Sequence, residues 1–407
     1  MKIDHIHFYV EDARASRDWF INHMGFQALA SGASRHTRTT VVRSGAVYIV
    51  FSSPLTSASP VAQFLRLHPP GVADIAFVVS DLESVVKRAV ANGAKVLQPI
   101  QQQQLAQGSW KCAKIAAWGS LTHTLIESLG GSYAADTPSY ADALAKREVV
   151  PLACSKYTSR SSNTPLLPIF SESEVTLDSV SPTQFSERSS TKFRVPSSNS
   201  GIFTGIDHVV LNVAAGDLEK ALSWYEEVLG FQRQQTFMIQ TDQSGLRSQV
   251  MVHPTSGVQF PINEPTSANS QIQEFLDVNQ GPGVQHIALQ TPRIVEAIAQ
   301  LRHLGLSFLP IPPSYYTQLQ NRYHGLPLSI AELEEIAAQE ILVDWHNESP
   351  QALLLQTFTQ PIFEKPTFFF ELIERRQEAQ GFGEGNFRAL FEAIEREQLK
   401  RGSLGFN

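Results

Sequence analysis

Short apolar stretches bounded by polar residues recur along the chain, and they come in the same order twice. Residues 3–10 (IDHIHFYV) nearly repeat at 206–213 (IDHVVLNV), and each stretch predicts a β-strand. A helical pattern ending in Gly-Phe follows both. Two later pairs also match: GVADIA at 71–76 with GVQHIA at 283–288, and TLIE at 124–127 with ELIE at 371–374. Four matches in one order indicate a duplicated unit.

Each half combines strand and helix patterns. In the first half we predict a helix at 12–24 and strands at 2–10, 47–51, 74–79 and 122–127. In the second half we predict strands at 206–213, 248–252, 284–290, 340–344, 351–358 and 368–374. We also predict helices there at 269–277, 293–303, 329–338 and 387–400. A further helix should be capped by Asp217 and end at Gly230, and Pro312–Tyr316 should form a turn.

This order predicts an α+β fold. We expect two tandem modules of paired βαβββ units that form open, mostly antiparallel barrels, with helices outside. The apolar positions of 387–400 recur at i, i+3, i+4 and i+7, so one face of this C-terminal lid helix should point inward.

The 407 residues suit two domains and a connecting segment. We assign residues 1–150 to an N-terminal module, 151–203 to a linker and 204–407 to a C-terminal module. The linker assignment depends on composition, because residues 155–200 contain fourteen serines, several prolines and few aromatic residues. Such a segment buries little apolar surface, so we expect it to be partly disordered.

The charge balance narrows the range of partners. The net charge is −7 and there is no basic tract, which argues against nucleic acid or an anionic membrane as partner. No apolar run approaches the length of a membrane span. The two cysteines have no motif spacing, which favours a reducing compartment, and we expect a cytoplasmic protein.

Of three matched strand positions, the two halves share the first and differ at the other two. The first half has His5, Asp74 and Thr124, and the second has His208, His286 and Glu371. Glu371 lies in an almost wholly apolar stretch, where an uncompensated carboxylate is costly. For a lone glutamate, an arginine partner or a solvent-exposed position on an edge strand could compensate the charge. A lone histidine is more often a hydrogen-bonded core residue than a metal ligand. Together, the three residues indicate a metal site in the second half only.

Two imidazoles and one carboxylate form the facial triad of non-haem Fe(II) oxygenases. That geometry leaves three adjacent coordination positions open, enough for a chelating 2-oxo acid and dioxygen. Zinc is an alternative, because the same ligand types occur at catalytic zinc sites. There is no nearby H-E-x-x-H helix to support a zinc hydrolase.

Longer motifs carry a resemblance to a known family. The second half resembles 4-hydroxyphenylpyruvate dioxygenase, a two-domain family of the vicinal oxygen chelate superfamily, and the first half is similar to its N-terminal module. The matching stretches cover most of 205–400 and include IDHVVLNV, PINEP, SQIQEFL, GPGVQHIAL, PPSYY, LLLQTFT, FFFELIER and GFGEGNFRALF. The resemblance implies oxidative decarboxylation of 4-hydroxyphenylpyruvate with O2, ring hydroxylation and side-chain migration, giving homogentisate and CO2.

The resemblance also assigns residues and partners. It implies one Fe(II) per chain, bound by His208, His286 and Glu371. It places the substrate among Ser248, Asn263, Gln271, Gln285, Gln356, Phe358, Phe382, Phe387 and Phe391, with Gln285, Gln356 and Phe387 closest to the chemistry. From pattern alone, the amides could be surface residues and Phe391 a core residue. Relatives of this kind form homodimers or homotetramers.

Three other functions remain open. Hydroxymandelate synthase resembles the family and uses the same substrate and iron, but tends to carry a smaller aliphatic residue at the position of Phe387. A non-catalytic small-molecule-binding protein would share the fold. Extradiol ring cleavage would share the fold and the ligand types, but would not require the GFGEGNF segment.

Overall fold

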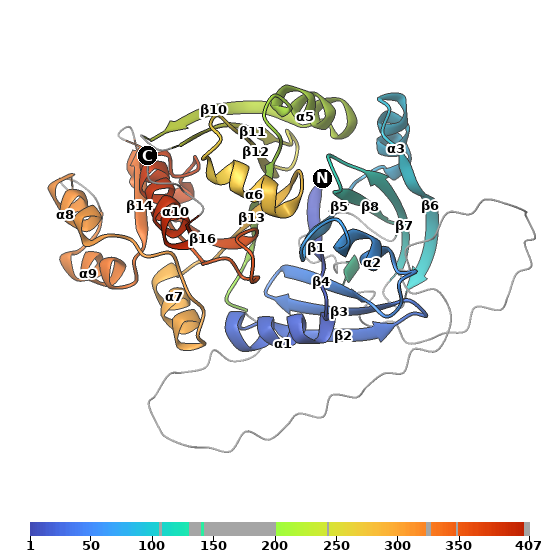
Figure 1. The fold of residues 1–407 in the computed structure, drawn as a ribbon, viewed down its shortest axis with the longest axis horizontal. Helices are drawn as coiled ribbons and strands as arrows, with labels where there is room; N and C mark the ends of the chain where they lie inside the picture. The colour runs from blue at the N-terminus through green and yellow to red at the C-terminus, as the bar shows by residue number, and fades with distance from the viewer. Residues whose placement is uncertain are drawn as a thin grey trace, which may run out of the picture.

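The computed structural model describes residues 1–105, 108–129, 140–141, 201–241, 244–322, 327–346 and 349–402. These residues form two modules that lie side by side, one from each half of the sequence (Figure 1). Of the predicted linker 151–203, only 201–203 belongs to the described residues, so the expected disorder of this segment lies outside them.

The N-terminal module contains eight strands and three helices among its described residues. In chain order they are β1 (Lys2–Tyr9), α1 (Ala13–Met24), β2 (Gln27–Ala33), β3 (Thr37–Ser44), β4 (Val47–Pro54), α2 (Pro60–Leu65), β5 (Gly71–Val78), α3 (Leu82–Ala91), β6 (Val96–Leu105), β7 (Gly108–Ala116) and β8 (Thr122–Ser128).

The C-terminal module repeats this order and adds helices. Its strands are β9 (Gly205–Asn212), β10 (Gln232–Gln240), β11 (Gly245–Val252), β12 (Gln259–Pro265), β13 (Gly283–Gln290), β14 (Leu342–His346), β15 (Ser349–Phe358) and β16 (Phe369–Arg375). Its helices are α5 (Leu218–Trp224), α6 (Gln271–Asn279), α7 (Ile294–His303), α8 (Pro313–Arg322), α9 (Ile330–Ala338) and α10 (Phe387–Arg401), with a π-helical turn η1 (Tyr225–Leu229) and 3-10 turns η2 (Arg376–Glu378) and η3 (Glu384–Asn386).

The two sheets have the same topology. Their strand orders are β2-β3-β4-β1-β5-β8-β7-β6 and β10-β11-β12-β9-β13-β16-β15-β14. In each sheet the two parallel contacts join the first strand of a βαβββ unit to its last, and the remaining contacts are antiparallel. The predicted fold class of paired βαβββ units in open, mostly antiparallel sheets is therefore confirmed.

The pattern did not predict six strands: the edge strands β2, β6 and β10, and the interior strands β3, β7 and β12. β10 (QRQQTFMIQ) is largely exposed, and β2 and β6 are rich in small or polar residues. An edge strand meets its neighbour on one side only, so its residues need little apolar alternation. The strands that the pattern did predict include the central pairs β1–β5 and β9–β13, which are buried on both faces.

Two local predictions were wrong. The segment from Pro312 to Tyr316 was expected to be a turn, but α8 begins at Pro313, because proline is well suited to the first turn of a helix. Asp217 precedes α5 but makes no capping hydrogen bond, since its carboxylate binds Lys220 Nζ at 2.8 Å. Glu264 accepts from the backbone N–H of Leu218 instead.

The modules share one hydrophobic core. Phe8 of β1 packs edge-on against Phe368 with 5.0 Å between ring centroids, and Phe20 of α1 packs against Phe370. Polar contacts also cross the boundary, including a hydrogen bond of 2.9 Å from Arg88 Nε to the Val228 carbonyl. The two modules therefore hold each other in a fixed orientation.

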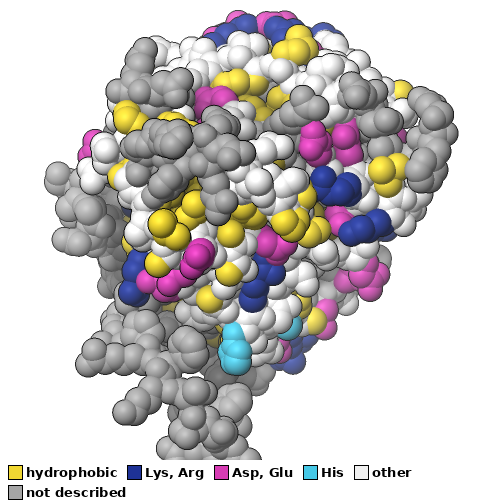
Figure 2. All heavy atoms as spheres, turned by 90° about the vertical axis from the view of Figure 1, so that its left-hand side faces the viewer, with side chains coloured by type: hydrophobic (Ala, Val, Ile, Leu, Met, Phe, Trp, Pro, Cys, Tyr) yellow, Lys and Arg dark blue, Asp and Glu magenta, His cyan; other side chains and the backbone are white. Residues whose placement is uncertain are grey.

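The surface is mixed in character. On the face that carries α8 and α9, apolar side chains lie among both acidic and basic ones (Figure 2). Among the described residues, no helix is long and apolar enough to cross a membrane.

Strand register aligns the two modules residue by residue. In the first, His5 and Thr124 both pair with Ala76. In the second, His208 and Glu371 both pair with Ala288. The same alignment matches Asp74 with His286. It also matches Lys114, which pairs with Thr124, with Phe358, which pairs with Glu371.

Lys114 changes the chemistry of the N-terminal module. Its Nζ lies 3.2 Å from Asp74 Oδ1, and both side chains are almost completely buried. Burial alone would raise the pKa of Asp74, but the Lys114 ammonium and the Thr122 hydroxyl hold that pKa below its usual value. An internal cation therefore compensates the carboxylate that stands where the C-terminal module has His286.

We predict that Lys114→Met destabilises the protein by about 3–5 kcal/mol, because it leaves Asp74 charged and unpaired in the core. Urea unfolding curves measure the effect. Lys111→Met, which breaks the exposed pair with Glu83, is the control and should leave the unfolding curve almost unchanged. A Lys114→Met protein as stable as the control would contradict the prediction.

Candidate functional site

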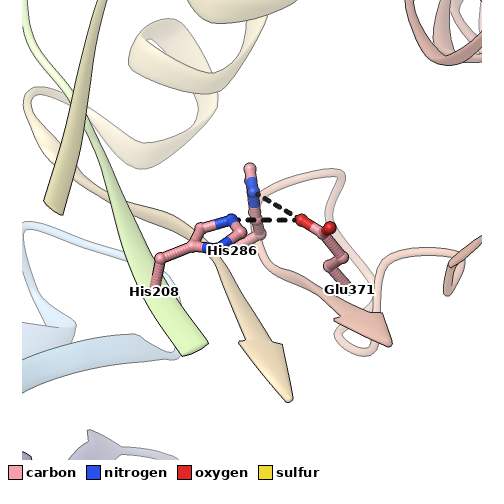
Figure 3. Close-up of side chains that lie close together, drawn as sticks. All are labelled: His208, His286 and Glu371. Atoms are coloured by element: carbon pink, nitrogen blue, oxygen red, sulfur yellow. Dashed lines mark ion pairs between the residues drawn. The ribbon is translucent and has the colours of Figure 1, made fainter. Parts of the chain in front are cut away.

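Three side chains converge from neighbouring strands of the C-terminal sheet. His208, His286 and Glu371 extend from β9, β13 and β16 and point toward one another (Figure 3). Glu371 Oε2 lies 3.2 Å from His208 Nε2 and 3.5 Å from His286 Nε2. The small residue Ala288 lies between His208 and Glu371 in the register, and His286, two residues earlier, faces the same side.

The donor set suits a metal ion. One ligand atom from each of the three residues lies within 4.8 Å of the other two. Glu371 Oε1 is buried and has no hydrogen-bond partner among the described residues, so the carboxylate has a free oxygen that a cation would satisfy. Two imidazole nitrogens and a carboxylate match the ligand types of divalent iron or zinc.

The pKa values of the three side chains depend on how close the side chains lie to one another. Burial by itself would lower the pKa of His208, but Glu371 and Asp207 raise it to about 9. Burial lowers the pKa of His286 despite the nearby carboxylate. For Glu371, burial acts to raise the pKa, yet His208 brings it below its usual value. Without a metal, one proton on His208 therefore compensates the buried carboxylate.

A buried ion pair orients the first histidine. His208 Nδ1 donates to Asp207 at 2.9 Å, which leaves Nε2 facing Glu371. Arg375 binds the same carboxylate with two hydrogen bonds, of 2.7 Å from Nε and 2.8 Å from a terminal nitrogen. The third guanidinium nitrogen donates to the carbonyls of Ala379 and Gly381. Hydrogen bonds of this kind fix the tautomer and ring orientation of metal-binding histidines.

The triad opens into a cavity with about 660 Å³ of empty space, part of which is open to solvent; it is here called the main cavity. It is enclosed by the concave side of the sheet, by α6 and by α10. The main cavity is large enough for a small aromatic molecule.

All nine residues that the resemblance placed around a substrate line the main cavity. They are Ser248, Asn263, Gln271, Gln285, Gln356, Phe358, Phe382, Phe387 and Phe391. The first five are buried polar groups. Gln271 Oε1 has no hydrogen-bond partner in the described part of the chain, although Asn263 donates to Asn212 at 3.3 Å. Among the described residues of the lining, none outside the triad has a charged side chain.

The aromatic residues form one wall. Phe387 packs edge-on against Phe237 with 5.1 Å between centroids, and Phe382 packs against the His208 ring at 5.3 Å. On α10, Phe387, Leu390, Phe391 and Ile394 all face the main cavity, as the helical periodicity predicted.

The segment before α10 approaches the sheet closely. Gly383 has φ 78°, and a Cβ there would collide with Gln356 Oε1. The neighbouring Gly385 donates its N–H to Asp344 at 3.0 Å, and the Tyr315 hydroxyl lies 2.8 Å from Asn386 Oδ1. These contacts hold α10 over the main cavity.

Pattern alone missed several residues of the site. Phe237 lies on an edge strand that was not predicted, and Phe369 was not singled out. Asp207 and Arg375 were not singled out, although each is adjacent to a motif position: Asp207 precedes His208, as Asp4 precedes His5. The repeat of Asp-His in both halves was the available signal.

Comparisons with known proteins agree with this geometry. Residues 4–113 and 205–322 each match the Glyoxalase/Bleomycin resistance protein/Dioxygenase superfamily. The chain is 35% identical to 4-hydroxyphenylpyruvate dioxygenase of Yarrowia lipolytica over 98% of its length and 93% of that protein. It is also 35% identical to the enzyme of the same name from Dictyostelium discoideum, over 98% and 99% of the two chains.

Solved structures show the same architecture. A mutant of 4-hydroxymandelate synthase from Streptomyces coelicolor superposes with a TM-score of 0.75 at 26% identity, over 98% of both chains. A fusion of a xylose isomerase-like TIM barrel with 4-hydroxyphenylpyruvate dioxygenase gives 0.67 at 20% identity, over 97% of this chain and 52% of the other, and supports the fold.

We predict that a divalent metal displaces about one proton when it binds, because His208, with its pKa near 9, is protonated in the metal-free protein at neutral pH. Apparent affinity should therefore rise with pH and level off above about 9. Calorimetry in buffers of different ionisation enthalpy measures the proton release. Binding at pH 7 that releases no proton would contradict this prediction.

Proposed function

The chain belongs to the 4-hydroxyphenylpyruvate dioxygenase family, and from this premise we propose that it converts 4-hydroxyphenylpyruvate and O2 to homogentisate and CO2 with one Fe(II) per chain. Family membership makes it a metal-using enzyme that acts on a small molecule with dioxygen. The observation that carries the proposal is the convergence of His208, His286 and Glu371 at a cavity lined by every residue expected around the substrate.

In this proposal the three residues are the iron ligands. Two neutral imidazoles and one carboxylate on one face of the ion leave room for a bidentate ligand and dioxygen. The bound metal would supply chelation of the 2-oxo acid and activation of dioxygen. Asp207 and Arg375 would hold His208 in the tautomer that presents Nε2 to the metal.

The remaining residues bind and orient the substrate. We assign the five neutral polar side chains to hydrogen bonds with the phenol and the keto-carboxylate, with Gln285 and Gln356 nearest the metal. Neutral groups suit this task because the metal already compensates the carboxylate charge. Phe358, Phe382, Phe387 and Phe391 would enclose the ring and exclude water.

The competing function is hydroxymandelate synthesis, favoured by the structural similarity to 4-hydroxymandelate synthase. That enzyme class tends to carry a smaller aliphatic residue at the position of Phe387. Here a full ring occupies the position and is held by Phe237. We therefore propose attack on the substrate ring, because Phe387 limits how the substrate can lie.

The N-terminal module has a supporting role in this proposal. We assign residues 1–150 to it, 151–203 to a linker and 204–407 to the catalytic module. Lys114 and Asp74 compensate each other there, so the N-terminal site needs no metal. We further propose a cytoplasmic homodimer or homotetramer, supported by the family resemblance.

We predict that the purified protein with Fe(II), ascorbate and oxygen yields homogentisate as the main product from 4-hydroxyphenylpyruvate. Product chromatography with authentic standards measures it. Hydroxymandelate as sole product would establish the competing function, and no turnover with iron bound would favour a binding protein.

We predict that Glu371→Ala abolishes metal binding and turnover, because it removes the only anionic ligand. The matched control is His5→Ala, at the equivalent strand position of the N-terminal module, which should retain one metal per chain and most activity. Metal content by mass spectrometry and turnover are both measured. Equal losses in the two variants would contradict a single metal site in the C-terminal module.

A further inference from the structure

A second cavity adjoins the main cavity on the far side of a thin wall. It comprises about 420 Å³ of empty space, part of which is open to solvent, and is here called the side cavity. The two cavities share four lining residues: Gln271, Gln285, Phe369 and Ile394. The Phe369 ring stacks on the His286 ring with 4.8 Å between centroids and 18° between planes. One aromatic ring therefore separates the side cavity from a residue of the triad.

The side cavity lies at the opposite end of α10 from Gly383 and Phe387. Its outer lining includes Glu397 and Arg401 in the last turns of that helix, together with Glu274 of α6. A helix of 15 residues spans about 22 Å. The side cavity therefore approaches the metal site from a different direction than the segment that precedes α10 does.

The lining of the side cavity mixes apolar and polar residues. Its five apolar residues are Leu309, Pro361, Pro366, Phe369 and Ile394. Two residues of this lining have a buried polar atom without a hydrogen-bond partner among the described residues. These atoms are Thr367 Oγ1 and Gln271 Oε1.

The mouth favours neutral molecules over anions. Glu274 binds Arg401 at 3.0 Å and Glu397 binds Lys400 Nζ at 2.7 Å, so each of these charges is already paired within the protein. Among the described residues of this lining, no unpaired cation is left to bind a carboxylate such as a 2-oxo acid, whereas an uncharged gas needs none. The apolar residues behind the mouth offer a small apolar molecule a surface to pack against.

We propose that the side cavity is the passage by which dioxygen reaches the metal site while the organic substrate fills the main cavity. The inference rests on the proposed function, since the reaction requires dioxygen after a large substrate has occupied the space in front of the triad. Gln271 and Ile394 form the boundary that dioxygen crosses.

Filling the side cavity tests the passage. Thr367→Phe places a ring in it, and Thr367→Val, which removes the hydroxyl at nearly constant volume, is the matched control. Pro361→Trp is a second filling variant at a half-buried position, in case the first disturbs folding. We expect the KM for dioxygen to rise several-fold in both filling variants, with the KM for the organic substrate and the kcat at saturating oxygen unchanged. An unchanged KM for dioxygen in both, or an equal rise in both KM values, would overturn the proposal.

Xenon supplies a readout that does not depend on catalysis. Crystals of the unaltered protein under xenon pressure should show xenon in the side cavity, and Thr367→Phe crystals should not. The absence of xenon from the unaltered protein would overturn the passage. If xenon binds there but the protein makes no homogentisate, the proposed function is contradicted. The side cavity would still be shown to be accessible to gas.

Discussion

A carboxylate buried in an apolar sheet is the constraint on which the C-terminal module depends. Glu371 is 3% exposed, and burying an ionised group without compensation is costly. Two imidazoles, brought from two neighbouring strands, provide the compensation, and a divalent cation between the three groups would complete it. This requires β9, β13 and β16 to be adjacent and in one register, which is the order the sheet adopts.

The two modules compensate a buried carboxylate in different ways. In the N-terminal module an acidic side chain stands at the place of His286, and an ammonium from the same sheet lies beside it. The charge is balanced within the protein, so no external ion is needed. In the C-terminal module an aromatic ring, Phe358, occupies the position of Lys114, and the space in front of the triad stays open. The exchange of Lys114 for Phe358 thus accompanies the exchanges of Asp74 for His286 and of Thr124 for Glu371.

Much of this could be predicted from the chain itself, because the strongest patterns belong to the most buried elements. The central strands and the inward face of α10 follow from apolar periodicity. The triad follows from comparing the two halves. The edge strands β2, β6 and β10 were missed because their residues show little apolar alternation, whereas the apolar edge strand β14 was predicted. The interior strands β3, β7 and β12 were also missed. Phe237 was missed with β10, and the pair of Asp207 and Arg375 required the fold, because 168 residues separate its members.

Arg375 has an effect that reaches beyond its carboxylate partner. On one side, its guanidinium binds Asp207, which orients the His208 ring. On the other side, it donates to the carbonyls of Ala379 and Gly381, just before Phe382, whose ring packs against the His208 ring. The segment leading into α10 and the His208 imidazole therefore depend on one guanidinium for their positions.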